Sequence, residues 1–490
     1  ASHLFILDGA PSHRLDYNRR LVEWVEQYAN GRRPRLDAAH WQRRLEALAA
    51  RHGVTGAVLG IVQDDDLAQA AYGVLNKDTG IATTTDSVFQ IGSITKVWTS
   101  TVVMQLVDEG RLDLDAPLVE LLPELRLADP DVTKQVTMRH LLTHTSGIDG
   151  DVFTDTGRGD DCLEKYVARL DEVGQNHPLG VTWSYCNSGF VLMGRVIEKI
   201  TGQTWDEALR ERLFTPLGLQ HTVTLPEEAL LHRAAVGHVA EGGGDPQRAP
   251  VWGLPRSVGP AGLIGASAAD VLAFAGMHLR GGVAADGTRV LSEAGAATMT
   301  DKHADLPDKH TLGDSWGLGW IRFDWDGHRL IGHDGTTIGQ NAYLRLLPSQ
   351  GLAVTLLTNG GHTQDLYQDL YREIFAELAG VAMPKPLAAP AQPPTVDRRR
   401  HLGTYERASA RIDVLERDGA NVLRTTLTGP LAELLPDPVE EYAMIPVDAS
   451  GDLFVVRQPN AQTWTPVTFY ALPTGERYVH FGVRATPKIA

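Results

Sequence analysis

The sequence predicts a mixed α/β (α+β) fold, followed by a small antiparallel β-barrel at the carboxy-terminal end. Three observations lead to this prediction. A two-strand pattern precedes an amphipathic helical pattern near residue 93, four further strand patterns precede a helical pattern at 363–379, and a series of short strands follows a proline-rich stretch. Apolar residues that alternate every two positions indicate strands, and a period near 3.6 indicates helices.

The composition indicates a globular chain with sizeable cores. Its 490 residues, 43% of them hydrophobic, are enough for two or three domains. The formal net charge of -16 repels phosphate backbones and anionic lipid surfaces. No segment has the roughly 18 consecutive apolar residues of a membrane-spanning helix. We therefore expect neither nucleic acid nor a membrane as a partner.

Few features bear on the cellular compartment. The first residues lack the basic and apolar regions of a signal peptide, so a cytoplasmic location is expected. The chain starts without Met, which leaves an exported mature form open. Cys162 and Cys186 are too few for a four-cysteine metal site and are expected to be free thiols.

The first half of the chain is predicted to begin with helices. Amphipathic patterns at 17–29 and 38–51 indicate a helical lead-in over residues 1–50. Strand patterns at 57–62 and 68–73, joined by a polar turn, then predict a hairpin in front of the next helix. Helices and loops dominate from there as far as about residue 230.

Strand character returns in the second half, at 319–323, 328–332, 341–347 and 352–358. Five prolines lie between Met383 and Val396, a density that neither a helix nor a central strand tolerates. We therefore place the domain boundaries around this stretch: lead-in 1–50, main domain 51–383, linker 384–397 and barrel 398–490. The predicted barrel strands are 402–406, 411–416, 421–427, 442–446, 453–458, 465–471 and 477–482.

The most informative stretch is Ser93-Ile94-Thr95-Lys96, where an extended run gives way to a helical pattern. Residues three apart on a helix are neighbours, so Lys96 would lie beside Ser93. A lysine whose pKa is lowered by burial can take the serine proton, and the serine then becomes a nucleophile without a histidine. The alternative for this motif alone is a helix N-cap serine followed by a solvated lysine.

A serine activated in this way needs a second proton carrier and a polar clamp. Tyr185-Cys186-Asn187 lies at the start of an apolar helical pattern. Tyr185 could relay a proton, while Asn187 could hold a substrate amide or Lys96. The literal Tyr-Ala-Asn at 28–30 is instead expected to end a helix before a glycine cap.

A third candidate motif is His333-Asp334-Gly335, which follows a predicted strand and precedes Thr336. A glycine at position 335 would let a substrate backbone approach the strand edge. The other two His-x-Gly sequences, at 401–403 and 480–482, fall in the predicted barrel and are interpreted as structural.

Taken in this order, the segments resemble the serine β-lactamase and penicillin-binding-protein superfamily, in its class C β-lactamase and D-aminopeptidase branch. The resemblance covers about residues 50–380 and includes the segments 137–147, 213–219 and 261–267. It implies a β-lactamase/transpeptidase-like antiparallel sheet flanked by helices, with a helical subdomain. The carboxy-terminal barrel resembles the lipocalin-like barrels of some relatives, which would wall one side of the cleft or build a homo-oligomer.

The resemblance also implies roles for the third motif. In the family this motif is usually Lys-Thr-Gly and binds the substrate carboxylate, whereas His333 takes the place of the lysine here. The replacement resembles the esterase and D-aminopeptidase members more than the true β-lactamases. It also weakens the case for carboxylate binding above about pH 6.5, where a histidine is largely neutral. The family fold implies that the backbone N–H groups of Ser93 and Thr336 hold the oxyanion, beside Gly335.

Other signals have simpler explanations. His140 and His144 are spaced like a zinc-binding pair, but Leu141 occupies the place of the glutamate that a zinc protease needs. Cys186 is interpreted as a small buried thiol rather than a second nucleophile. Trp320 is expected to pack in the core, and the role of Trp252 stays open. We expect no metal and no cofactor.

The sequence thus predicts a serine acyl-transfer enzyme that forms an acyl-Ser93 intermediate. Lys96 and Tyr185 would shuttle protons, and His333 would orient Tyr185 or bind the end of the substrate. The expected substrate is a small molecule or short peptide with an amide, peptide or ester bond. Two alternatives stay open: a transacylase of secondary metabolism that passes the acyl group to an amine or alcohol, and a non-catalytic binding homologue.

Overall fold

The computed structural model describes residues 36–64, 66–240, 244–428, 438–457 and 461–490, together with 14, 15, 17–19, 21, 22 and 432. The predicted helix at 17–29 and the Tyr-Ala-Asn at 28–30 therefore lie largely outside the described residues. The second predicted helix is confirmed as α3 (Ala38–Arg51), which Asp37 caps by accepting a hydrogen bond from the His40 N–H at 3.0 Å.

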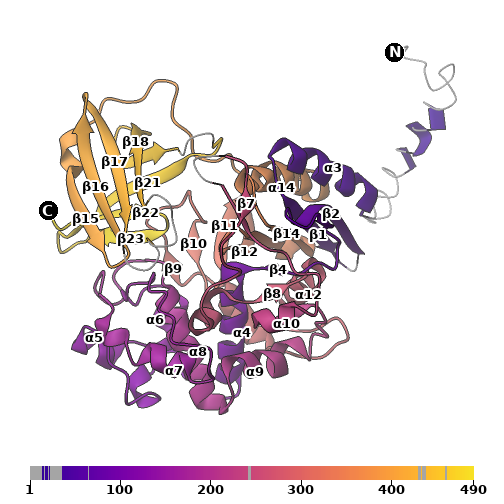
Figure 1. Cartoon of the computed structure of the whole chain (residues 1–490), viewed down its shortest axis with the longest axis horizontal. Helices are drawn as coiled ribbons and strands as arrows, with labels where there is room; N and C mark the ends of the chain where they lie inside the picture. Colours follow the sequence, from indigo (N-terminus) through magenta and orange to yellow (C-terminus); the bar gives the residue numbers. More distant parts are fainter. Residues whose placement is uncertain are drawn as a thin grey trace.

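A nine-stranded antiparallel sheet forms the centre of the molecule (Figure 1), in the order β3-β2-β1-β14-β13-β12-β11-β10-β9. The predicted hairpin is confirmed as β1 and β2. The strands are β1 (Gly56–Gln63), β2 (Asp66–Asn76), β3 (Ile81–Ala82), β9 (Ala304–Asp305), β10 (Ser315–Trp316), β11 (Ile321–Trp325), β12 (His328–Thr336), β13 (Asn341–Leu347) and β14 (Leu352–Thr358).

Each face of this sheet has its own apolar core, as the two-residue period of a strand requires. Val58 of β1 belongs to one core, and its neighbours Ala57 and Leu59 belong to the other. Helices α3 and α14 (Thr363–Ala379) cover the second face. Helices α4 (Thr95–Asp108), α8 (Asn187–Thr201) and α12 (Ala268–Leu279) contribute to the first. The predicted antiparallel sheet flanked by helices is confirmed.

The remaining elements of the main domain are short. The other helices are α5 (Pro130–Gln135), α6 (Met138–Leu142), α7 (Cys162–Val167), α9 (Trp205–Leu209), α10 (Pro226–Ala229), α11 (Gly259–Gly262) and α13 (Glu293–Thr300). Strands β4 (Phe89–Gln90), β8 (Gly265–Ala266) and β5 (Thr222–Val223) form one small sheet, and β6 (His238–Val239) pairs with β7 (Gln247–Arg248). None of the described helices is both long and apolar enough to cross a bilayer.

The carboxy-terminal region is antiparallel throughout, as predicted, but its ladders form two sheets rather than one continuous barrel. A single bridge between Tyr405 and Lys488 connects the outer edges of the two sheets, which share one apolar core. One sheet contains β15 (Gly403–Arg407), β16 (Ala410–Arg417), β17 (Ala420–Leu427) and β18 (Val439–Ala443); the other contains β19 (Ile445–Pro446), β20 (Leu453–Val456), β21 (Thr465–Ala471), β22 (Arg477–Phe481) and β23 (Arg484–Pro487).

Candidate active site

Ser93 lies at the junction between the main sheet and helix α4. It belongs to a single 3-10 turn, Gly92–Ile94, and α4 begins two residues later at Thr95. Gly92 has a φ of 51°, and a Cβ there would lie 2.6 Å from the backbone nitrogen of Thr336. Glycine is therefore needed immediately before Ser93, because the backbone at position 92 is left-handed and lies against strand β12.

Lys96 is completely buried beside Ser93. Its Nζ lies 3.1 Å from Ser93 Oγ, 2.7 Å from Asn187 Oδ1 and 2.6 Å from the Ala261 carbonyl oxygen. Burial, and then the positive charge of Arg484, hold the pKa of Lys96 well below its usual range. A neutral amine has two hydrogens and one lone pair. The two carbonyl oxygens accept the hydrogens, so the lone pair is left to accept the Ser93 hydroxyl proton.

Tyr185 lies directly over this amine, with Lys96 Nζ 4.8 Å from the centre of its ring. Its hydroxyl is buried and makes no hydrogen bond of good geometry to any described residue. Burial raises the pKa of Tyr185 well above its usual range, although the hydroxyl of Ser93 acts in the opposite direction. Since burial disfavours a phenolate and favours a neutral lysine, Lys96 is better suited to be the base and Tyr185 to pass on a proton.

Asn187 begins helix α8 and connects two groups. Its Oδ1 accepts a hydrogen bond from Lys96, and its Nδ2 donates to Asp151 Oδ1 at 3.3 Å. Of the two predicted roles for Asn187, the structure therefore shows contact with the lysine. Asn187 as a whole is buried, with 7% of its surface exposed.

The third motif lies inside strand β12, which continues to Thr336 through pairing with β13. The prediction that the strand ends at residue 332 is thus wrong. A Cβ at Gly335 would lie 1.8 Å from the Ile91 carbonyl oxygen and 3.0 Å from the Ser93 nitrogen. Gly335 consequently makes room for the backbone that carries Ser93, and not only for a substrate.

His333 is buried and neutral. Its Nδ1 lies 2.6 Å from the Asp334 carbonyl oxygen, which places the proton on Nδ1, and Nε2 has no partner among the described residues. Burial, with a smaller contribution from Lys96, lowers the pKa of His333 to about 3. The ring centres of His333 and Tyr185 are 6.2 Å apart. His333 therefore cannot provide a positive charge for a carboxylate near neutral pH.

The carboxy-terminal region contributes residues that the sequence analysis missed. The turn between β22 and β23 enters the main domain, where the Val483 carbonyl accepts a hydrogen bond from the Tyr185 N–H at 3.1 Å. The guanidinium of Arg484 lies 4.8 Å from the centre of the Tyr185 ring. Arg484 also forms a two-point ion pair with Asp151, at 2.6 and 3.0 Å, and Arg407 adds a third contact to Asp151 at 2.7 Å.

Two further residues fix the segment around Tyr185. His144 is fully buried, stacks on the Tyr185 ring with centres 4.4 Å apart, and accepts the Cys186 N–H at 2.9 Å through Nδ1. The Cys186 sulfur accepts a hydrogen bond from the Gly189 N–H at 3.2 Å and caps α8. Cys162 and Cys186 are both free thiols, as expected, and burial raises the pKa of Cys186 to about 12.

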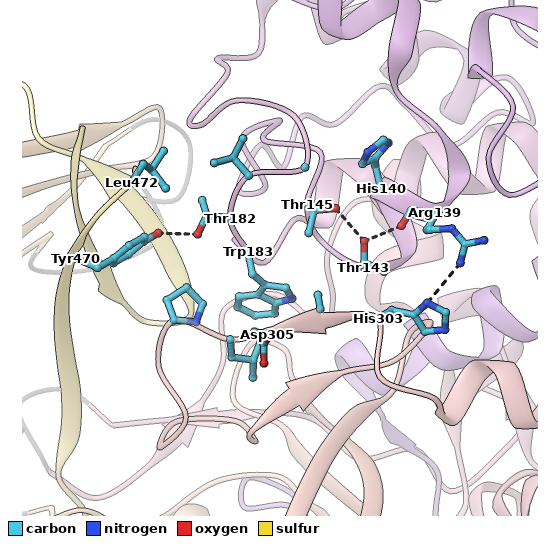
Figure 2. A pocket seen from close by; sticks show the side chains of 15 residues that line it. Arg139, His140, Thr143, Thr145, Thr182, Trp183, His303, Asp305, Tyr470 and Leu472 are labelled. Carbon is cyan, nitrogen blue, oxygen red and sulfur yellow. Dashed lines mark hydrogen bonds between the residues drawn. The ribbon is translucent and has the colours of Figure 1, made fainter. Parts of the chain in front are cut away.

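A cavity of about 620 Å³ lies between the main domain and the carboxy-terminal region (Figure 2). Neither Ser93 nor Lys96 lines it. Tyr470 and Thr182 share a hydrogen bond of 3.1 Å at one side of the cavity, and Trp183 forms part of its wall. Trp183 also contacts the His144 ring at 5.6 Å between centres. The cavity thus adjoins the aromatic residues that support Tyr185 rather than the nucleophile.

Comparison with known proteins agrees with this arrangement. The Beta-lactamase family model matches residues 41–378. Penicillin-binding protein 4 of Amycolatopsis lactamdurans is 52% identical over 374 residues, which cover 76% of this chain and 98% of that protein.

Solved structures extend the comparison. The crystal structure of SurE with D-Leu covers 92% of this chain and 99% of its own, at 27% identity and a TM-score of 0.73. D-amino acid amidase from Ochrobactrum anthropi SV3, complexed with D-phenylalanine, covers 66% of this chain and 92% of its own, at 25% identity and a TM-score of 0.56.

Proposed function

Because the chain belongs to the Beta-lactamase family of serine hydrolases and acyltransferases, we propose that it forms an acyl-Ser93 intermediate and hydrolyses amide, peptide or ester bonds. The observation that carries this proposal is the contact between Ser93 and a buried lysine whose other two neighbours are both acceptors. That arrangement directs a lone pair at the serine hydroxyl, which is the requirement for a nucleophile activated by an adjacent base.

In the acylation step, Lys96 Nζ takes the proton of Ser93 Oγ, and Oγ forms a bond to the substrate carbonyl carbon. The bond from that carbon to the leaving amine or alcohol then breaks. The leaving group receives a proton through the Tyr185 hydroxyl, which takes one in turn from Lys96. The backbone N–H groups of Ser93 and Thr336 would stabilise the oxyanion, and the close contact of Gly92 with the Thr336 nitrogen supports this role.

Deacylation uses the same side chains, with a water molecule as the nucleophile and Ser93 as the leaving group. A water molecule gives a proton to Lys96 and attacks the acyl carbon, the bond between the acyl carbon and Oγ breaks, and Ser93 recovers its proton. An amine or alcohol in place of water would give acyl transfer. The neutral His333 leaves no cationic third motif for a substrate carboxylate, so efficient turnover of β-lactams is not expected.

The similar structures suggest a substrate class. SurE was solved with D-Leu. The other enzyme is named a D-amino acid amidase and was solved with D-phenylalanine as well as with L-phenylalanine, and both proteins share the fold of this chain. We therefore propose that the preferred acyl donors or acceptors contain a D-amino acid residue.

Intact-protein mass spectrometry tests the proposed function. The protein is exposed briefly to a penicillin, to a p-nitrophenyl ester and to D- and L-leucine amides, with Ser93→Ala as the control. We expect an adduct of acyl mass on the native chain alone, and faster release of ammonia from the D-amide. Equal labelling of Ser93→Ala, or no adduct and no turnover with any donor, would contradict the proposal. A competing amine that appears in the product would identify transfer.

A further inference from the structure

Asp151 lies at the only point where the described residues connect the carboxy-terminal region to Lys96 through hydrogen bonds between side chains. Its Oδ1 accepts from Asn187 Nδ2 and from Arg484 Nη2, at 3.3 and 2.6 Å. Its Oδ2 accepts from Arg484 Nε and Arg407 Nη1, at 3.0 and 2.7 Å. Only 9% of the Asp151 side chain is exposed, so these donors satisfy a buried carboxylate.

We propose that Asp151 is a positioning residue, which holds the Asn187 amide with its oxygen toward Lys96 and thereby keeps the lysine lone pair directed at Ser93. The inference rests on the proposed function for the role of Ser93, but the orientation of the amide can be tested without turnover.

The orientation follows from the chemistry of the two side chains. A carboxylate only accepts hydrogen bonds, so Asn187 must present its NH₂ group to Asp151 and its oxygen to Lys96. In the opposite orientation the NH₂ group would donate to the lysine nitrogen. The lone pair of Lys96 would then be occupied by Asn187 and could not accept the Ser93 proton.

The two arginines make Asp151 hard to replace, even by asparagine. Burial works to raise the pKa of Asp151, but Arg484 and Arg407 outweigh it and lower the value to about 2. In Asp151→Asn, the single remaining oxygen keeps more of its donors at the Oδ2 position, where Arg484 Nε and Arg407 Nη1 both donate, so the NH₂ group takes the Oδ1 position and faces Asn187 and Arg484 Nη2. The new NH₂ group would then force the Asn187 amide to turn round.

The charged and titratable groups that face Lys96 act on its pKa in opposite directions, so a slower acylation in Asp151→Asn would have to come from the turned amide and not from a loss of the neutral amine. After burial, Arg484 lowers the pKa of Lys96, whereas Cys186 and Asp151 raise it. Tyr185 lies over the amine, and the neutral His144 and His333 are near enough to be affected by its charge. Removal of the Asp151 charge and a donor from Asn187 therefore both favour the neutral amine further.

Asp149 supplies a matched control. It is also buried, and it also contacts the carboxy-terminal region, because its Oδ2 accepts the Ala408 N–H at 2.9 Å. Its other side-chain contacts are Asn176 Nδ2 at 3.2 Å and the Asp151 N–H at 3.0 Å, and it does not contact Asn187. Asp149→Asn thus tests the loss of an acidic contact between the two regions without a direct effect on the amide.

The experiment compares Asp151→Asn, Asp149→Asn, Asn187→Ala and the double variant Asp151→Asn/Asn187→Ala. Acyl-enzyme formation is followed by mass spectrometry with the best donor. In parallel, the Lys96 Cε signal is followed by NMR in protein labelled with [ε-¹³C]lysine, assigned by its absence in Lys96→Met. We expect Asp151→Asn to slow acylation at least about 10-fold and to shift the Lys96 signal, while Asp149→Asn does neither. In the Asn187→Ala background, Asp151→Asn should add no more than about a 2-fold loss.

The inference is overturned if Asp151→Asn is acylated as fast as Asp149→Asn, or if its Lys96 signal is unchanged. It is also overturned if the rate loss in the double variant equals the product of the losses in Asp151→Asn and Asn187→Ala. If the substitution only destabilised the fold, the amount of acyl-enzyme would fall while the NMR signal of Lys96 stayed unchanged. Absence of any acyl-enzyme in the native chain would count against the proposed function, and the lysine signal would still decide whether Asp151 sets the state of the amine.

Discussion

The guanidinium of Arg484 and the ring of Tyr185 lie 4.8 Å apart, although the two residues come from different regions of the fold. Lys96 Nζ lies at the same distance from the ring centre. Of these two neighbours only Lys96 can exchange a proton with the phenol, because the guanidinium of Arg484 stays protonated. The positive charge of Arg484 also acts on the amine, whose pKa burial has already lowered.

Replacement of Arg484 by Ala is expected to move the acid limb of the pH–rate profile to higher pH. Arg484 lowers the pKa of Lys96, so its removal raises that pKa, and a higher pH is then needed for the neutral amine. Acylation by a p-nitrophenyl ester between pH 5 and 9 measures the shift. Arg411→Ala, at a half-exposed arginine of the same region, serves as the control. If the acid limb stayed in place or moved to lower pH, Arg484 would not be lowering the pKa of Lys96.

Lys96→Met should reduce acylation by about 10²- to 10⁴-fold, the usual contribution of a positioned base. Methionine has a similar length but cannot accept the Ser93 proton. Lys134→Met, at an exposed lysine, should react like the native chain. The amount of acyl-enzyme and the rate of its formation, measured by intact-protein mass spectrometry, are compared between the variants. An unreduced rate in Lys96→Met would show that another group activates Ser93.

Gly335→Ala is expected to destabilise the fold and to slow acylation together. The new Cβ would lie 1.8 Å from the Ile91 carbonyl oxygen, so β12 would have to move away from the Ser93 turn. Overpacking of this kind costs about 1–3 kcal/mol. Gly174→Ala is the matched control, because no atom lies within 4 Å of its Cβ position. Thermal unfolding and acylation rates are measured for both variants, and equal values would contradict the close contact.

Affinity for substrates with a free carboxylate should not rise between pH 7 and pH 5. An ordinary histidine gains its charge in this range, but the pKa of His333 is lowered to about 3, mainly by burial. KM values for a carboxylate substrate and for its methyl ester, measured across this range, provide the test. A selective fall in KM for the carboxylate as the pH decreases would show that His333 becomes cationic in the site.

Cys186 should be inert toward thiol reagents in the folded protein. Burial raises its pKa to about 12, and its sulfur is hydrogen-bonded to the Gly189 N–H and to the Ile148 carbonyl oxygen. We expect no reaction of either cysteine with Ellman's reagent until the protein is unfolded. Cys186→Ser should still form the acyl-enzyme. Loss of the adduct in this variant, with an unchanged melting temperature, would give the thiol a chemical role.

Much of the site could be predicted because its residues fall in short motifs. Ser93 and Lys96 are one helical turn apart, and Tyr185 and Asn187 mark the start of a helix, so spacing and the family resemblance identify them. The end of β12 was predicted wrongly because His333-Asp334-Gly335 has the composition of a turn. Pairing of Asp334 with Tyr343 and of Gly335 with Ala342 outweighs that local preference.

Asp151, Arg407 and Arg484 could not be found in the same way. An ion pair between residues that lie hundreds of positions apart leaves no periodic pattern in the sequence. Strand β23 was also missed, because it is short and ends at Pro487. The carbonyl of Ala261 gave no signal of its own either, since every residue has a carbonyl group and only the folded backbone selects this one.

The late positions of Arg407 and Arg484 in the sequence also determine when the contacts of Asp151 can form during synthesis. Ser93 and Lys96 leave the ribosome early, when neither Arg407 nor Arg484 has yet been made. Asp151 can therefore gain its two cationic partners only after both of these arginines have been synthesised. The full set of contacts around Asn187 forms only when translation has passed the last strands.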